Sequence, residues 1–315
     1  MVQINTSPNC NLNKRNMKER TIYALGFFDG VHRGHQALME TCRALADRQG
    51  FQAGVVTFGN HPDTLVQGHT PALLMTASQR ERILKVQFHM DTVVTLLFDE
   101  QLRSMPWERF LQMLKENYGA AGFVCGDDFR FGHRGQGNAQ VLSEYCRAEN
   151  LPCAVVPEQM VDGRRVSSTY IRSQIESGDM ETAVRFLGRP FTIRGKVVHG
   201  HQLGRTLGIP TANLRLPEGL VSPRFGVYAC LCNVDGVRYP AVTNVGTRPT
   251  VNGEGVTVEP WILDFEGDLY DREISLEFYK FLRPEMKFES LSALQAEIRR
   301  NAAETREYFA GRMEP

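Results

Sequence analysis

The stretch Ala24-Leu-Gly-Phe-Phe-Asp-Gly-Val-His-Arg-Gly-His35 decides the architecture of the first half of the chain. It overlaps an apolar, β-prone run at residues 21–28, which favours a strand. Residues 34–50 then carry apolar side chains at helical spacing: Ala37, Leu38, Cys42, Leu45 and Ala46. The sequence therefore predicts a strand, a turn containing glycines and the beginning of a helix.

Such a turn is a binding site for anions, because backbone N–H groups and the positive end of the helix dipole point out of it. His32 and His35 would place two imidazole donors beside a bound phosphate, and Asp29 stands in the same turn. Three glycines would let the phosphate approach the backbone closely: Gly26, Gly30 and Gly34. A structural histidine pair is one alternative. Zinc is another, but it needs further ligands, and no cluster of Cys or carboxylates stands nearby.

The pattern after this turn alternates between strand and helix. Strands are predicted at 51–58, 92–98, 121–125 and 151–156, and helices at 76–90, 106–118 and 138–150. This alternation favours a parallel, doubly wound sheet, in which ligands bind at the carboxyl ends of the strands. Two polar segments stand at such ends, namely Thr57-Phe-Gly-Asn-His-Pro62 and Gly126-Asp-Asp-Phe-Arg-Phe-Gly132.

The character of the sequence changes near Gly188-Arg-Pro190. Short β-prone runs follow, and Asp235-Gly236 between two of them is a strong hairpin signal. The second half is therefore expected to form a small antiparallel barrel, followed by an amphipathic helix at 292–309. We expect three parts: a polar extension at 1–20, a first domain at 21–187 and a second at 188–315.

Composition narrows the class of protein. The 315 residues are 42% hydrophobic and 23% charged, and Lys plus Arg equals Asp plus Glu at 36 each. Nothing in this balance points to nucleic acid or to a membrane surface as a partner. The polar N-terminus and the lack of a long apolar run predict a cytoplasmic protein. Of seven cysteines, Cys125, Cys153, Cys230 and Cys232 stand in apolar runs and are expected to be buried thiols.

Two further segments in the first half can handle phosphate. Gly126-Asp-Asp-Phe-Arg-Phe-Gly132 carries two carboxylates and a guanidinium, although a solvated turn with a structural Asp–Arg pair explains it equally well. Arg165-Val-Ser-Ser-Thr-Tyr-Ile-Arg172 places hydroxyls and two arginines at the expected start of a helix. That arrangement would form a second anion cradle opposite the first.

In the second half the informative run is Gly204-Arg-Thr-Leu-Gly-Ile-Pro-Thr-Ala-Asn-Leu214. Thr211 and Asn213 stand two residues apart, so in an extended segment both side chains point to the same face. Their neutral oxygens could share Mg²⁺ with the phosphates of a nucleotide. A glycine-containing turn before a barrel strand is the structural alternative.

These motifs resemble known families. His32-Arg-Gly-His35 after a first strand is the mark of the nucleotidyltransferase superfamily, and residues 28–35 look like its FAD synthetase branch. The run from Gly204 to Leu214 resembles the Mg·ATP motif of riboflavin kinases. The set resembles the prokaryotic bifunctional riboflavin kinase and FAD synthetase family. It implies a Rossmann-like nucleotidyltransferase domain of the α/β class, followed by a riboflavin kinase-like β-barrel with a C-terminal helix.

The resemblance implies two activities. Riboflavin and ATP would give FMN in the C-terminal domain, and FMN and ATP would then give FAD and pyrophosphate in the N-terminal domain. Mg²⁺ is expected with ATP as co-substrate, and no permanently bound organic cofactor. The implied partners are the small molecules riboflavin, FMN and ATP, with no nucleic acid and no membrane. The oligomeric state is left open.

The resemblance also implies roles for residues. His32 and His35 would act in adenylyl transfer, and Glu259 would be the general base of the kinase, whose hydroxyl substrate is barely acidic. Thr211 and Asn213 would hold the metal. ATP and its phosphates would be bound by Gly26, Phe28, Asp29, Gly30, Gly34, Asp128, Arg165, Ser168, Thr169, Arg172, Gly204, Arg205, Gly208 and Pro210. The flavin would be bound by Asn244, Arg248, Thr250 and Trp261.

Some positions depart from the family's commonest pattern. Phe27 stands where many members have Asn, and Asp128 where some do. Pro260-Trp261 follows Glu259 where an apolar residue and His are usual, and Asn301 stands where Asp is common. Trp261 has two interpretations: a structural one, in which it packs in the core, and a functional one, in which it contacts the flavin. The rival functions are a protein that keeps only one activity and a flavin-binding regulator without turnover.

Overall fold

The computed structural model describes residues 20–198, 209–250 and 253–312, with side chains described except at 248–250, 253 and 254. Its contacts divide the chain into two compact units. The first comprises residues 1–71 and 76–167, and the second comprises 72–75 and 168–315. The domain boundary expected near residue 187 from the change in sequence character stays a prediction.

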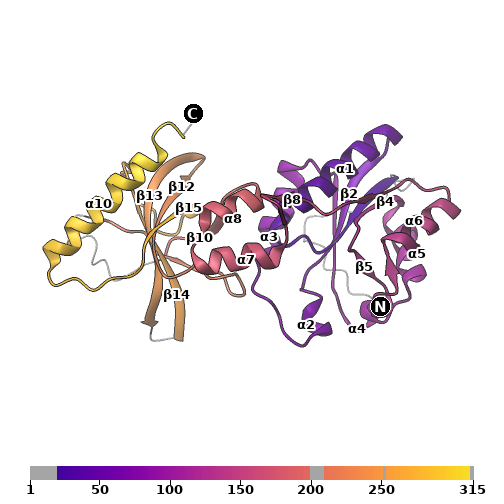
Figure 1. The fold of residues 1–315 in the computed structure, drawn as a ribbon, viewed down its shortest axis with the longest axis horizontal. Helices are drawn as coiled ribbons and strands as arrows, with labels where there is room; N and C mark the ends of the chain where they lie inside the picture. The colour runs from indigo at the N-terminus through magenta and orange to yellow at the C-terminus, as the bar shows by residue number, and fades with distance from the viewer. Residues whose placement is uncertain (1–19, 199–208, 251–252, 313–315) are drawn as a thin grey trace. The chain divides into compact units, whose positions relative to one another are not determined.

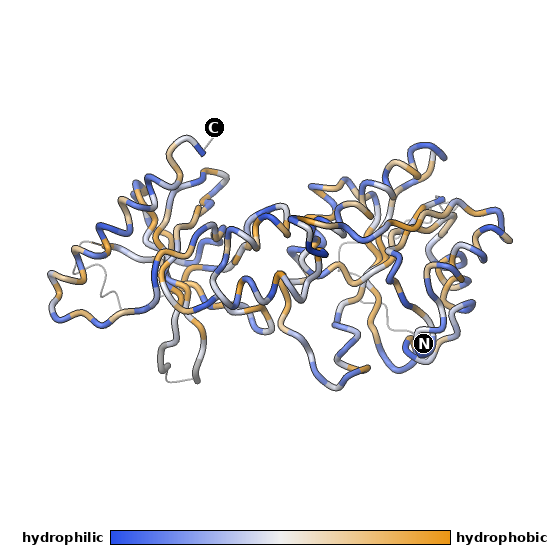
Figure 2. Tube along the Cα trace, in the orientation of Figure 1, coloured by the Kyte–Doolittle hydropathy of each residue, from blue (hydrophilic) through white to orange (hydrophobic). Residues whose placement is uncertain are grey.

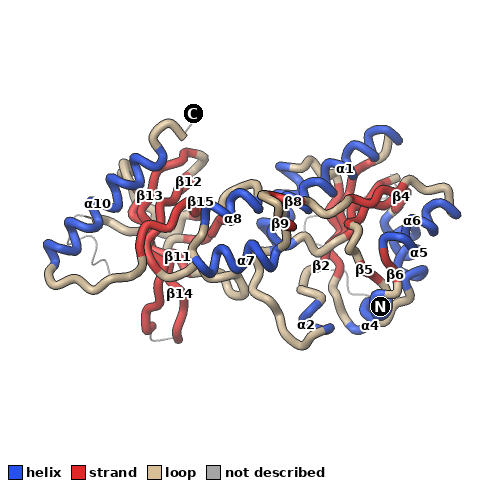
Figure 3. Tube along the Cα trace, viewed as in Figure 1, coloured by secondary structure: helices blue, strands red, loops and turns tan. Residues whose placement is uncertain are grey.

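A five-stranded parallel sheet forms the centre of the first unit. Its spatial order is β3-β2-β1-β4-β7, and every neighbouring pair is parallel. Figure 3 shows these strands among helices. The strands are β1 (Thr21–Leu25), β2 (Gln52–Phe58), β3 (Thr92–Leu96), β4 (Ala120–Gly126) and β7 (Cys153–Val156). The expected parallel sheet is confirmed.

Helices cover both faces of this sheet. Right-handed crossovers place α1 (Arg33–Gln49), between β1 and β2, on one face. They place α5 (Trp107–Tyr118), between β3 and β4, on the other, because the chain there runs back across the sheet. Along with α6 (Ala139–Ala148), α5 packs on Tyr23, Leu25 and Phe123 in one apolar core. Figure 2 shows hydrophobic residues concentrated in the strands of this sheet.

The strand order reverses between β1 and β4. These two strands are neighbours, although one lies at the start of the chain and the other begins at Ala120. At such a point the loops after the two strands diverge and leave a crevice, where ligands of doubly wound sheets bind. The turn after β1 and the segment that begins at Gly126 therefore lie at the same edge of the sheet.

Several short elements were not expected from the sequence. The expected helix at 76–90 is α3 (Ala77–Arg82) followed by a π-helical turn, η2 (Ile83–Gln87), and it ends before His89, whose φ is 51°. Thr76 is its N-cap, and Thr76 and Gln79 form a reciprocal capping box. The other short elements are η1 (Asp29–Val31), α2 (Asp63–Val66), α4 (Glu100–Arg103), β5 (Arg130–Phe131), η3 (His133–Gly135), β6 (Gly137–Asn138), β8 (Met160–Val161) and β9 (Arg164–Arg165).

The second unit contains an antiparallel sheet of order β10-β15-β12-β13-β14-β11. A hydrogen bond from Val198 N to Asn213 O (2.9 Å) joins the two ends, so the sheet is a nearly closed barrel. Asp235 and Gly236, with φ of 50° and 90°, form the predicted hairpin turn. The elements are α7 (Ser168–Ser177), α8 (Met180–Leu187), β10 (Phe191–Lys196), β11 (Leu214–Arg215), β12 (Gly226–Val234), β13 (Val237–Thr250), β14 (Gly253–Ile262), β15 (Glu273–Arg283) and α10 (Leu291–Phe309). Figure 1 shows α10 beside the barrel, where it packs on β12 and β13.

The second unit also holds a short segment from early in the chain. Leu73 pairs with Leu220 in a parallel bridge, with Leu73 N donating to Gly219 O (2.7 Å) and Val221 N to Leu73 O (2.8 Å). Arg172 of α7 donates from Nε to Ala72 O (2.5 Å). These bonds explain why residues 72–75 cluster with the barrel. None of the helices in the described part of the chain has the length and apolar character needed to cross a bilayer.

The described cysteines are all free thiols. Cys125, Cys230 and Cys232 are buried as expected, whereas Cys153 is only half-buried. A hydrogen bond with the Cys146 thiol lowers the pKa of Cys153 below its ordinary value. Burial raises the pKa of Cys125 to about 12, because a thiolate is poorly solvated in the core. Cys153 therefore carries the most reactive thiol among these residues.

We expect iodoacetamide to alkylate Cys153 before the other described cysteines. The rate should rise with pH, with a midpoint at lower pH than for an ordinary thiol, because the thiolate is the nucleophile and the pKa of Cys153 is lowered. Cys146→Ala should move this midpoint upward by removing the hydrogen bond. Peptide mass mapping after timed labelling at several pH values measures each site. A Cys153 rate that keeps the same midpoint in the variant would contradict the assignment.

Candidate active sites

The turn after β1 has an unusual backbone. Phe28, Gly30 and Val31 have φ of 60°, 78° and 38°, and His32 then returns to an extended conformation as the N-cap of α1. Left-handed conformations are costly for Phe and for a β-branched Val, and such strain persists only where surrounding structure holds it. At Gly26, a Cβ atom would lie 2.8 Å from the ring of Phe28, so glycine is needed for that ring to fold back over the strand end.

His32 and His35 form one stacked pair. Their ring centroids lie 3.6 Å apart with 15° between the planes, and the ring of Phe28 meets His35 edge-on at 5.2 Å. His32 is 6% exposed, and its Nδ1 accepts the backbone N–H of His35 (3.3 Å), which caps the helix. The structure thus places both imidazoles at a helix N-terminus, where the backbone favours negative charge.

Asp128 and Arg165 meet in the first unit. An ion pair joins their side chains, and Nη1 of Arg165 also lies 2.8 Å from Oε1 of Glu158. All three side chains are substantially exposed, so each pair contributes about 0–1 kcal/mol to stability. Since Asp128 follows β4, this cluster begins at the same sheet edge as the histidine turn.

Ser168, Thr169 and Arg172 belong to α7 in the second unit. Ser168 and Thr169 are the first residues of that helix, as expected from the sequence. Arg172 is half-buried and donates to Ala72 O, so its guanidinium has at least one structural partner. A phosphate contact by these three residues stays a prediction.

In the second unit the segment at residues 211–213, which is predicted to hold a metal and which we call the metal segment, lies against β14. Ala212 N donates to Pro260 O (2.9 Å), which brings Thr211 and Asn213 beside the strand that carries Glu259. All of these side chains except the buried Pro260 are half-buried. The proline does not break the strand, since Pro260 pairs with Thr243 within a continuous ladder. It uses its carbonyl there to hold the metal segment in place.

Glu259 and Trp261 point to the same face of β14, because alternate residues of a strand share a face. Glu259 is directly opposite Asn244 on β13, and Trp261 is opposite Val242. Trp261 packs against a small core of Val227, Val242, Leu263 and Ala302. The core-packing interpretation of Trp261 thus has contacts to support it, and its flavin contact stays a prediction.

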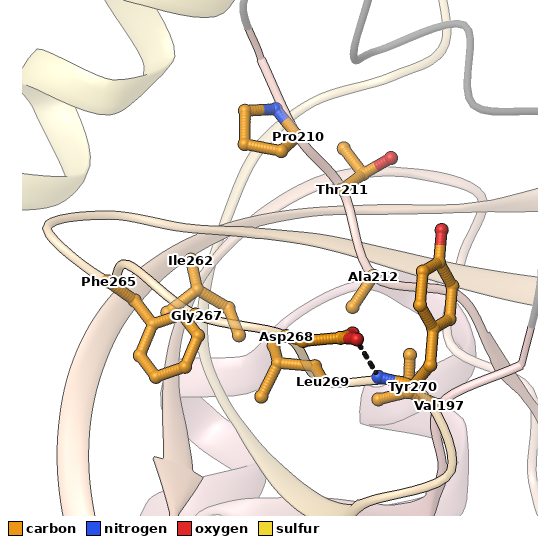
Figure 4. Close-up of a pocket in the computed structure, with 10 residues that line it drawn as sticks. All are labelled: Val197, Pro210, Thr211, Ala212, Ile262, Phe265, Gly267, Asp268, Leu269 and Tyr270. Carbon is orange, nitrogen blue, oxygen red and sulfur yellow. Dashed lines mark hydrogen bonds between the residues drawn. The ribbon is translucent and has the colours of Figure 1, made fainter.

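A cavity of about 270 Å³ is lined in part by Pro210, Thr211 and Ala212 of this part of the chain. Figure 4 shows Ile262 and Phe265 on one side, Tyr270 on the other, and Thr211 on the segment above them. The Asp268 carboxylate accepts the N–H of Tyr270 (3.0 Å), which fixes the loop between them. Asp268, Leu269 and Tyr270 were not predicted as site residues from the sequence, because only the packing shows that they line a cavity.

Asn301 stands where Asp is common in the family, and it forms a polar network with Arg283 and Glu297. Asn301, which is buried, accepts a hydrogen bond from Nε of Arg283 (3.0 Å) and donates to Glu297 (3.3 Å). Arg283 also pairs with Glu297 at 3.3 Å. The neutral amide satisfies a cation and an anion together, so the substitution leaves both charged groups with partners.

The structure describes only some of the remaining residues that were predicted to bind ATP or flavin. Pro210 lines the cavity. Gly204, Arg205 and Gly208 lie outside the described residues. Arg248 and Thr250 are described only as backbone in β13. Their ATP and flavin contacts stay predictions.

Family models match both halves of the chain. A model described as FAD synthetase matches residues 14–170, and one described as riboflavin kinase matches residues 187–309. Among solved structures, one titled a macrolide-efflux protein from Streptococcus pneumoniae superimposes with a TM-score of 0.85. It is 29% identical and the match covers 92% of this chain and 95% of that one.

Curated relatives match over almost the whole length. A bifunctional riboflavin kinase/FMN adenylyltransferase of Pseudomonas fluorescens is 38% identical, with 90% of this chain and 92% of the relative covered. Proteins of the same description from Listeria monocytogenes and Escherichia coli K12 are 32% and 34% identical. The Listeria match covers 92% of this chain and 92% of the relative. The Escherichia coli match covers 93% of this chain and 94% of the relative. With both halves matched in order, this chain belongs to the family of bifunctional riboflavin kinase/FMN adenylyltransferases.

Proposed function

We propose that the chain catalyses two consecutive steps of flavin nucleotide synthesis. The second unit phosphorylates riboflavin to FMN with ATP, and the first unit transfers the adenylyl group of a second ATP to FMN, releasing pyrophosphate. The observation that supports the proposal is that one chain holds two distinct arrangements of polar residues, one in each unit. One is a stacked histidine pair at a helix N-terminus, and the other is a Thr211–Asn213 segment bonded to the strand of Glu259.

In adenylyl transfer the enzyme has to align the phosphate of FMN with ATP, and it does not have to move a proton. The attacking phosphate of FMN is already ionised at pH 7, so no general base is required. His32, His35 and the N-terminus of α1 would bind the ATP phosphates and neutralise the charge that develops on them. Arg165 would join them by exchanging its exposed partners, Asp128 and Glu158, for a phosphate. Because exposed ion pairs are weak, that exchange costs little.

The phosphorylation of riboflavin has a different need. Its nucleophile is an alcohol, so a positioned carboxylate is useful as a general base, and we assign Glu259 to that role. ATP would occupy the cavity beside Thr211, where Ile262, Phe265 and Tyr270 provide apolar and aromatic walls for a planar base.

The metal segment, of which Thr211 lines the cavity, has donors that suit Mg²⁺ bound together with ATP. Thr211 and Asn213 offer neutral oxygens, and Mg²⁺ prefers oxygen ligands with phosphate supplying the negative charge. Within the described residues, no group of three or more His, Cys, Asp or Glu side chains is placed to hold a metal. A metal held by Thr211 and Asn213 would therefore depend on the nucleotide. When bound there, Mg²⁺ would neutralise the phosphates of ATP.

The proposal includes small molecules as the only substrates and the cytoplasm as the place of action. Riboflavin, FMN and ATP are all that the two reactions require. The equal numbers of acidic and basic residues give no electrostatic reason for a nucleic acid partner.

A chromatographic time course with riboflavin, ATP and Mg²⁺ tests the proposal. We expect FMN to rise first and then to convert to FAD. Accumulation of FMN alone would restrict the function to the kinase. If riboflavin is not consumed, FMN is added directly. FAD would then identify a transferase alone, and flavin binding without any product would favour a regulator.

A further inference from the structure

Arg80 of α3 is a buried cation in the first unit. Its exposed fraction is 4%, and Asp29 in the turn after β1 is 3% exposed. Charged groups are rarely buried to this degree unless they are paired, because burial removes their hydration. The proposed chemistry assigns no role to Arg80, so its position needs a separate explanation.

The guanidinium of Arg80 joins three parts of the first unit. It lies 4.6 Å over the ring of Phe27, which follows β1. Its Nη2 donates to the carbonyl of Phe58 at the end of β2 (2.5 Å). It also interacts electrostatically with Asp29 in η1, against which α3 packs. One side chain therefore links the ends of two neighbouring strands with the turn that leads to the histidines.

Phe27 is held on its other sides as well. The ring centroids of His61 and Phe27 lie 4.5 Å apart with 71° between the planes, and the hydroxyl of Thr57 donates to the Phe27 carbonyl (2.8 Å). His61 is fixed in turn, since its Nδ1 accepts the backbone N–H of Asp63 (3.1 Å). Arg80, Phe27 and His61 form one contact cluster, in which Arg80 lies over the Phe27 ring and the His61 ring is nearly perpendicular to it; we call this cluster the Phe27 stack.

The direction of Arg80 is also fixed. Thr76 Oγ1 accepts the N–H of Gln79, and Gln79 Oε1 accepts the N–H of Thr76 (3.0 Å), so the first turn of α3 has a complete capping box. Arg80 is the next residue along that helix. The stack is thus supported by a rigid element.

We infer that Arg80 is a positioning residue for adenylyl transfer, which through Phe27 and Asp29 holds the strained turn that presents His32 and His35. The inference rests on the proposed function of the first unit. It also explains Phe27, whose aromatic face gives the guanidinium a stacking surface that an asparagine lacks. Without the guanidinium, Asp29 would be a buried carboxylate lacking this cation, and the Phe58 carbonyl would lose its donor.

The test compares Arg80→Met, Arg80→Lys and the matched control Arg82→Met, which alters an exposed arginine of the same helix. We expect Arg80→Met to lower kcat for FAD formation by about 100-fold, as a misplacement of about 1 Å would. Lysine should recover less than a tenth of the lost activity, because it keeps the charge but lacks the planar fork. Arg82→Met should match the wild type, and FMN formation should stay within about twofold in every variant.

Two readouts separate positioning from simple structural support. Activity is expressed per folded molecule, from the circular dichroism amplitude of each preparation, so partial unfolding alone leaves kcat unchanged. The double variant Arg80→Met/Asp29→Asn should lose less than the product of the two single losses, because the second change removes the carboxylate with which Arg80 interacts. Phe27→Leu keeps apolar volume without the ring face and should lower kcat about tenfold, which gives a test should Arg80→Met not fold.

The outcomes distinguish the inference from the proposal beneath it. If the wild type forms no FAD from FMN and ATP, the proposed function fails and the inference fails with it. If the wild type forms FAD and Arg80→Met equals Arg82→Met per folded molecule, only the inference is overturned. Fully multiplicative losses in the double variant would also overturn it, since Arg80 would then act independently of Asp29.

Discussion

Replacing His32 with asparagine is expected to lower FAD formation from FMN and ATP by at least about 100-fold while FMN formation from riboflavin continues. Removing one preorganised donor to developing charge typically costs a factor of about 100 to 1,000. His32 also caps α1 through Nδ1. Asparagine is a good N-cap residue, so this variant removes the imidazole but keeps a side-chain acceptor for the helix.

Two comparisons make the His32 result specific. His32→Ala should lose the same activity and, in addition, about 1 kcal/mol of stability, because alanine cannot cap the helix. His89→Asn serves as the control, because His89 is exposed with φ of 51°, a conformation that asparagine accepts. Both products are followed in one chromatographic assay, with thermal unfolding measured in parallel. Loss of FMN formation along with FAD formation would contradict two separate sites.

The second large effect is expected at Glu259. Glu259→Gln should lower FMN formation by about 100- to 10,000-fold, the usual contribution of a general base, while FAD formation from added FMN is retained. Glutamine has the size of glutamate and keeps a hydrogen-bonding oxygen. The ladder that pairs Glu259 with Asn244 should therefore survive the change.

The control for Glu259 is Glu289→Gln, which neutralises an exposed carboxylate of the same unit. Initial rates with riboflavin and with FMN as separate substrates are compared for the two variants and the wild type. An undiminished kinase turnover in Glu259→Gln would exclude Glu259 as the base. Equal losses in both reactions would instead indicate a general defect of folding.

The sequence predicted the elements whose signals are local. Alternating apolar runs identified the parallel sheet of the first unit. Asp235-Gly236 identified a hairpin of the antiparallel barrel, because few residues adopt the positive φ that this turn needs. The helix after Thr76 was predicted too long, since its apolar spacing continues through a π-helical turn that propensity does not distinguish. Helix α8 and the short strands β5, β6, β8 and β9 were not predicted, because tertiary pairing decides such short segments.

In the candidate sites, too, features that depend on local sequence could be predicted, and features that depend on tertiary packing could not. His32 and His35 are close in sequence, so their meeting at a helix start could be predicted. The stacking of their rings depends on rotamers and could not. Asp128 and Arg165 are 37 residues apart, and only the folded chain pairs them. Arg80 carries no sequence signal at all, because its role depends on how α3 packs against η1.

The segment at residues 72–75 has a consequence for how such a gene can be divided. These residues cluster with the second unit, while the chain before and after them belongs to the first. A single break after residue 167 would give two products, one of which carries Leu220 without the Leu73 backbone that pairs with it. Recombination that exchanges one module for another would therefore need to transfer this short segment as well, or replace its bridge. The two activities are separable in chemistry, but their coding sequences interleave.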